Sequence, residues 1–149
     1  MAHRARGFTL IEMLITLAIL GVLATAVLPL AQVQSQRSQE LQLRRALWDI
    51  RHGIDAYKRA VSEGRIPRAL GSSGYPPDLN TLVEGVADQT DPKRNKIFFL
   101  RRIPRDPMQR NSGLDDAASW GLRSYASTAT DPQEGDDVYD VYSTSTQTG

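Results

Sequence analysis

The residue of this sequence with the clearest chemical potential is Glu12, a carboxylate inside an otherwise apolar run. The run covers residues 8–30 and contains no other Asp, Glu, Lys or Arg. A charge near the centre of a bilayer costs at least ~2.5–3.5 kcal/mol, so it normally has a partner. If the chain is cleaved after Gly7, the new α-amino group of Phe8 is a cation that can neutralise Glu12 of a neighbouring subunit. The alternative is a carboxylate near the membrane interface, stabilised by the positive end of the helix dipole.

The apolar run is long enough to cross a membrane, and a short basic segment precedes it. Residues 1–7 carry two arginines, and a basic start before an apolar helix is typical of a cytoplasmic end. About 20 helical residues at 1.5 Å each cross a bilayer core. The small residue Gly7 favours cleavage before the run, because no small-residue cleavage site follows it. We therefore expect a cleaved leader at residues 1–7 and a transmembrane and assembly helix at residues 8–30.

Two residues weaken this expected helix. Pro29 lacks the N–H group that would bond to residue 25, and Gly21 has a low helix propensity. The stretch between them can therefore bend or unwind. The alternative is a simple proline kink that Thr25 supports.

A different pattern begins beyond the apolar run. Apolar residues recur at spacings of three and four, which predicts one buried stripe along a helix. The helix is expected to end near Ser62, because Gly64 and Pro67 follow it. The stripe consists of Leu43, Leu47, Ile50, Ile54, Tyr57 and Val61.

The rest of the chain predicts loops and a few short strands. Residues 64–96 are interrupted by Gly and Pro and predict a loop with one short helix at residues 78–83. Residues 97–104 predict an extended segment. Residues 120–127 and 137–143 predict an antiparallel hairpin that covers the apolar stripe. The expected core partners of the stripe are Phe98, Leu100, Trp120, Tyr125 and Val141. The predicted fold class is α+β, a long N-terminal helix with a small C-terminal antiparallel β-sheet packed on it. The expected globular domain is residues 31–149.

Composition narrows the classes of function. The 149 residues suffice for one modest domain and an anchor. The chain has no cysteine and two histidines, which leaves no thiolate chemistry and little material for a histidine-based active site. The sequence lacks a phosphate-binding loop, and its net charge of +1 gives no basic field for nucleic acid. We therefore expect no enzyme, no cofactor and no nucleic-acid partner.

Two parts of the sequence resemble a known family. The segment RGFTLIEMLITLAILGVLATAVLP resembles the N-terminus of type IV pilins and type II secretion pseudopilins. The later segments YPPDLNTLVEG, FFLRRIPRDPM and DDVYDVYSTS are similar to the major pseudopilins of type II secretion. The resemblance implies a pilin fold, cleavage after Gly7 and N-methylation of Phe8. It also implies an assembly role for Glu12 and partial melting of the helix around Gly21 and Pro29 in the filament.

The resemblance further implies a function and a location. The expected function is a structural subunit of a type II secretion pseudopilus, which polymerises through its N-terminal helix and helps to export folded proteins. The expected location is the bacterial inner membrane, crossed once, with the globular domain in the periplasm before assembly into a periplasmic filament. The expected partners are copies of the chain, other pseudopilins, the assembly platform, the prepilin peptidase/methyltransferase and membrane lipid. The alternatives are a type IV pilus subunit, for adhesion, motility or DNA uptake, and a monomeric membrane-tethered ligand-binding domain.

The family resemblance also implies a calcium-binding loop, and here the sequence departs from the pattern. Met108 occupies a position where Trp is usual, and six residues follow Ser143 where the loop normally extends further. Asp136, Asp137 and Asp140 offer hard oxygen ligands, although their spacing is not that of an EF-hand. A solvated acidic turn is the favoured interpretation, and a calcium site is the alternative.

Overall fold

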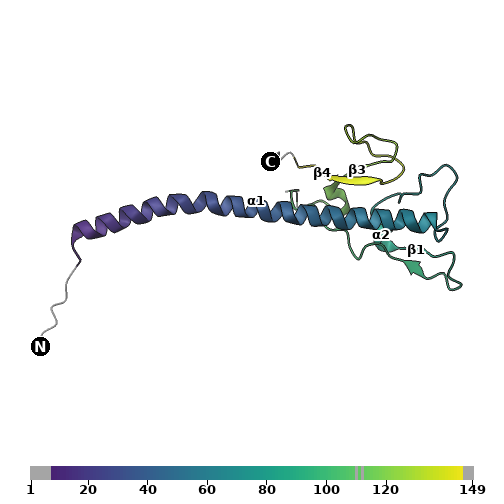
Figure 1. Cartoon of the computed structure of the whole chain (residues 1–149), viewed down its shortest axis with the longest axis horizontal. Helices are drawn as coiled ribbons and strands as arrows, with labels where there is room; N and C mark the ends of the chain where they lie inside the picture. The colour runs from purple at the N-terminus through teal and green to yellow at the C-terminus, as the bar shows by residue number, and fades with distance from the viewer. Residues whose placement is uncertain (1–7, 110, 112, 146–149) are drawn as a thin grey trace, which may run out of the picture. The chain divides into compact units, whose positions relative to one another are not determined.

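The computed structural model describes residues 8–109, 111 and 113–145, without the side chains of residues 26–33. The chain forms two units, Met1–Ser38 and Gln39–Gly149, and the second is called the head below. The elements, drawn in Figure 1, are α1 (Leu10–Ser62), α2 (Asn80–Glu84), β1 (Val86–Ala87), β2 (Lys96–Ile97), the 3-10 helix η1 (Ala117–Ser119), β3 (Trp120–Arg123) and β4 (Asp140–Ser143).

Helix α1 ends where the sequence predicts, and Gly64 provides the stop. The Arg65 N–H donates to the Ala60 carbonyl at 2.9 Å, and the Gly64 N–H donates to the Val61 carbonyl at 3.0 Å. Gly64 has φ of +72°, a conformation that favours glycine. These features define a Schellman motif, which satisfies the last carbonyl groups of the helix.

The buried face of α1 forms the centre of the head core. Ile50 and Ile54 are almost completely buried, and Leu43 and Leu47 are partly buried against the same cluster. Figure 1 shows α2 and β1 on one side of the C-terminal part of α1 and strands β3 and β4 on the other. The other buried apolar members include Leu79, Leu82, Ile103, Trp120, Val138 and Val141. The prediction that the hairpin covers the stripe is therefore confirmed.

Strands β3 and β4 pair antiparallel, as predicted. Their register places Gly121 opposite Tyr142 and Leu122 opposite Val141. Both strands are shorter than predicted, because the chain leaves the ladder after Arg123. The next N–H groups bond elsewhere: that of Ser124 donates to the Gln133 carbonyl at 2.9 Å.

The middle of the chain differs from the prediction in three ways. Strands β1 and β2 pair antiparallel within a region that was predicted to be loop up to residue 96. The expected extended segment at residues 97–104 forms a strand only at Ile97, because the next N–H groups, of Phe99 and Leu100, both donate to the Leu82 carbonyl. Phe98 and Tyr125, two predicted core residues, are 63% and 61% exposed. The short helix was placed correctly to within two residues, as α2.

Candidate assembly site

The first turn of α1 positions Glu12 by a capping interaction. The Glu12 N–H donates to Oγ1 of Thr9 at 3.3 Å. Thr9 and Glu12 thus have the Thr-x-x-Glu spacing of a capping box, and Glu12 lies in the turn where the helix dipole favours a negative charge. This cap was not predicted, although the spacing is visible in the sequence. Through its position in this turn, the charge of Glu12 therefore stabilises its own helix, apart from any contact with another subunit.

The Glu12 carboxylate is exposed. It has no hydrogen-bond or ion-pair partner among the residues that the structure describes. Gly7, the predicted cleavage residue, lies outside the described residues. Phe8, the predicted new N-terminus, is described and is exposed.

The N-terminal part of α1 presents an apolar surface that nothing in the described chain covers. Every side chain from residue 8 to residue 25 is exposed, and Phe8 and Leu10 reach 74% and 79%. Thr16 and Thr25 donate their hydroxyl groups to the helix carbonyls of Met13 and Val22, at 2.9 and 2.7 Å. The two hydroxyl groups are thus satisfied within the helix. Glu12 carries the one charged side chain in residues 8–25.

Helix α1 is continuous through Gly21 and Pro29, the two predicted weak points. A Cβ atom added to Gly21 would meet no atom within 4 Å, so packing inside the chain does not require a glycine there. The side chain of Pro29 lies outside the described residues, and melting between the two positions stays a prediction. Within the described part of the chain, no helical segment combines the length and apolar character that a membrane crossing requires.

Comparison with known proteins connects this helix to a family. The family model "Prokaryotic N-terminal methylation motif" matches residues 2–28. Type II secretion system core protein G of Klebsiella pneumoniae is 28% identical over 144 residues, covering 91% of this chain and 94% of the relative. That of Pectobacterium carotovorum subsp. carotovorum is 27% identical over 142 residues, covering 91% and 84%. The chain belongs to the type II secretion pseudopilins.

Two further comparisons bear on this assignment. Fimbrial protein EcpB of Eikenella corrodens is 29% identical over 96 residues, which cover 64% of the pseudopilin chain and 58% of that relative. No significant match to a solved structure was found.

The pseudopilin head brings together the distant residues that carried the family resemblance. Asp106 is buried, and its carboxylate accepts hydrogen bonds from the Ser143 hydroxyl at 2.5 Å and the Met108 N–H at 2.8 Å. The indole N–H of Trp120 donates to the Pro104 carbonyl at 2.7 Å. These hydrogen bonds connect the Pro-Arg-Asp-Pro turn at residues 104–107 to both strands of the β3–β4 hairpin. Its role is structural, because it holds the hairpin on the core.

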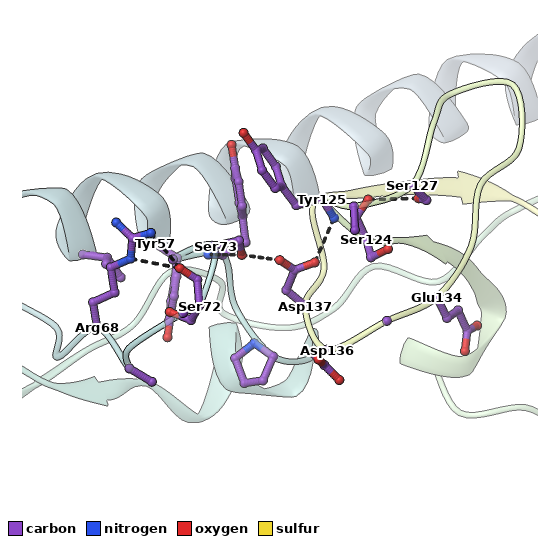
Figure 2. Close-up of a pocket in the computed structure, with 18 of the residues that line it drawn as sticks. Tyr57, Arg68, Ser72, Ser73, Ser124, Tyr125, Ser127, Glu134, Asp136 and Asp137 are labelled. Carbon is purple, nitrogen blue, oxygen red and sulfur yellow. Dashed lines mark hydrogen bonds between the residues drawn. The ribbon is translucent and has the colours of Figure 1, made fainter.

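The three predicted calcium ligands of the pseudopilin do not form one site. Asp140 pairs with two arginines, and Asp137 accepts hydrogen bonds from the Tyr125 N–H and the Ser73 hydroxyl, as Figure 2 shows. Asp136 is exposed. Among the described residues, no group of three or more His, Cys, Asp or Glu side chains is arranged to hold a metal ion. The residues therefore do not fit calcium, which takes six to eight oxygen ligands.

An open groove of about 1280 Å³ is lined in part by Asp136 and Asp137. Loop residues 67–77 and 124–137 line most of it, and Figure 2 shows how Asp137 connects the two loops. Burial raises the pKa of the Tyr75 phenol above its usual value, and nearby tyrosines and carboxylates raise it further. The described lining contains no histidine or cysteine. No Ser-His or Cys-His pair is therefore formed among the described lining residues.

Proposed function

We propose that this chain is a structural subunit of a type II secretion pseudopilus and that it polymerises through the N-terminal part of α1. The observation that carries the proposal is the exposed apolar surface of residues 8–25, which includes one carboxylate. The apolar stripe of the head is covered within its own chain. The apolar surface of residues 8–25 is therefore buried by other molecules, namely by lipid before assembly and by neighbouring helices afterwards.

The proposal includes a maturation step and a location. A prepilin peptidase removes residues 1–7, and the new N-terminal amine of Phe8 is methylated. Residues 8–30 then anchor the subunit in the inner membrane, with residues 31–149 in the periplasm. Support comes from the methylation motif that matches residues 2–28 and from the exposed apolar helix. The proposed partners are copies of the chain, other pseudopilins, the assembly platform and lipid, and the subunit contributes contacts rather than catalysis.

Glu12 has two separable roles in this proposal. Its backbone N–H takes part in the helix cap with Thr9, whereas its carboxylate neutralises the Phe8 amine of an adjacent subunit. A charge that is buried among apolar helices is costly without such a partner. Removal of the carboxylate should therefore affect assembly more than insertion.

A pair of matched variants tests the roles of the cap and the charge. Glu12→Gln removes the charge but keeps a side chain that suits the capping box, and Thr9→Val removes the cap but keeps the charge. We expect Glu12→Gln to insert in the membrane and to give at least tenfold fewer sheared filaments, since one unpaired buried charge corresponds to several kcal/mol. Thr9→Val should lose about 1 kcal/mol of helix stability and still assemble.

Membrane fractionation and filament yield are the two measurements. Wild-type filament yield from Glu12→Gln would contradict the proposed charge pairing. Equal losses from both variants would assign the whole effect to helix capping.

A type IV pilus subunit is the second candidate, because the fimbrial protein EcpB is also similar to this chain. Complementation separates the two candidates. The chain should restore secretion in a strain that lacks its core protein G, and it should not restore pili in a strain that lacks its major pilin. The opposite pattern would favour the pilus.

A further inference from the structure

Asp140 begins strand β4 and is held by an arginine from α1. The Arg51 Nε atom lies 2.7 Å from Oδ1 of Asp140, and Nη2 of the same guanidinium lies 3.4 Å from Oδ2. The same Nη2 atom also donates to the Val141 carbonyl at 3.4 Å. One guanidinium therefore contacts both carboxylate oxygens and the backbone of the strand, a geometry that is stronger and more directional than a single contact.

A second arginine reaches the same carboxylate from strand β3. Arg123 pairs with Asp140 in the register of the sheet, and its Nη2 atom lies 3.4 Å from Oδ2. Its guanidinium also lies over the ring of Tyr139, 4.5 Å from the centroid. Two positive charges thus face Asp140. A divalent cation at this carboxylate would be repelled by both of them.

The other two carboxylates of the acidic turn do not complete a cation site. Both oxygens of Asp137 accept hydrogen bonds, Oδ1 from the Tyr125 N–H at 2.8 Å and Oδ2 from the Ser73 hydroxyl. Asp137 thereby joins the loop before β4 to two other loop segments, as Figure 2 shows. A calcium ion would have to displace these donors and both arginines to gain its ligands.

We propose that Arg51 replaces the calcium ion that the family resemblance implies, so that the head of this chain folds and holds β4 in place without the ion. The positive charge that binds Asp140 then belongs to α1 itself. Hydrogen bonds from Ser73 and Tyr125 fix the loop that precedes the strand. The inference concerns the head alone and does not depend on how the N-terminal helix assembles.

Thermal unfolding of the full-length protein in detergent tests the proposal. The melting temperature of the head should be the same with excess calcium chloride and with EGTA. Arg51→Met and Asp140→Asn should each lower the melting temperature by roughly 2–5 °C, since the pair is partly exposed. The double variant Arg51→Met/Asp140→Asn should be about as stable as the less stable of the two single variants, because both changes remove the same contact. Asp136→Asn, at an exposed carboxylate, is the matched control and should change nothing.

Calcium binding would overturn the proposal in two ways. One is a calcium-dependent rise in the wild-type melting temperature that Asp136→Asn or Asp140→Asn abolishes. The other is terbium luminescence that calcium competes away and that depends on the same carboxylates. If Asp140→Asn does not fold, the wild-type comparison and Arg51→Met still decide the question. Calcium binding to the head, or its absence, does not bear on the proposed assembly through α1, because filament yield is measured separately.

Discussion

Substitution of Ile54 by alanine measures how much the head depends on the buried face of α1. Ile54 is 1% exposed and belongs to the cluster that joins α1 to the hairpin and to α2. Ile→Ala at a buried site removes three methyl or methylene groups and leaves a cavity. Such substitutions typically cost about 2–5 kcal/mol.

The expected shift in melting temperature follows from the size of the head. A unit of roughly 110 residues has an unfolding entropy of roughly 0.23 kcal/mol/K, so the cost corresponds to about 9–22 °C. Circular dichroism at 222 nm also reports the N-terminal helix. Near-ultraviolet circular dichroism of Trp120, which is buried in the same cluster, is therefore the better assay of the head.

Leu41→Ala is the matched control on the same helix. Leu41 is 56% exposed, and exposed substitutions usually change stability by less than about 0.5 kcal/mol, or roughly 2 °C here. Equal losses from Leu41→Ala and Ile54→Ala at low protein concentration would refute the assignment of the buried face.

Three further predictions concern maturation, acid stability and turns. Intact-mass analysis of membrane-extracted protein should show a methylated chain that begins at Phe8, with a formal charge of −1 after loss of the two leader arginines; retention of either arginine would contradict cleavage after Gly7. Hydrogen bonds from Thr90 and an arginine lower the pKa of Asp88 from 3.8 to about 2. Its stabilising contribution should therefore be complete above pH 3.8 and be lost as the pH falls towards 2, and Asp88→Asn should flatten the acid-unfolding curve there. Gly85→Ala should destabilise the head more than Gly71→Ala, because both positions have positive φ but only Gly85 would place its Cβ atom 2.8 Å from a backbone oxygen of β2; equal melting temperatures would disprove the clash.

The parts of the fold that sequence could predict are those with a local signal. The spacing of Ile50, Ile54 and Tyr57 reports a helix face directly, because helical periodicity needs no distant contact. The β1–β2 pairing has no such signal, since each strand has only two residues. It depends on Asp88 and Asp91: the Asp88 N–H donates to the Asn95 carbonyl at 3.0 Å, and Oδ1 of Asp91 accepts from the Lys93 N–H at 2.9 Å.

The same distinction applies to the candidate sites. The position of Glu12 in an apolar run is a local signal, and so is its capping partner Thr9, three residues away. The partner of Asp140 is 89 residues away on α1, and no spacing rule connects the two. The family resemblance and the acidic turn together made Asp140 a calcium candidate, and an acidic turn looks the same in sequence whether its carboxylates face a metal ion, an arginine or water.

The head buries its apolar stripe, whereas the apolar side chains of residues 8–25 are exposed. This difference predicts how a chain without the N-terminal residues behaves. Residues 31–149, released from the apolar run, should form a soluble domain that is mainly monomeric, because its stripe is buried within one chain. The largest exposed apolar group that remains on the α1 face of the head is Trp48, 63% exposed and stacked on His52. Sedimentation velocity at increasing concentration should therefore give one species. A stable oligomer that Trp48→Ser disperses would instead place a principal assembly contact on the head, and the N-terminal helix would then contribute anchoring more than polymerisation.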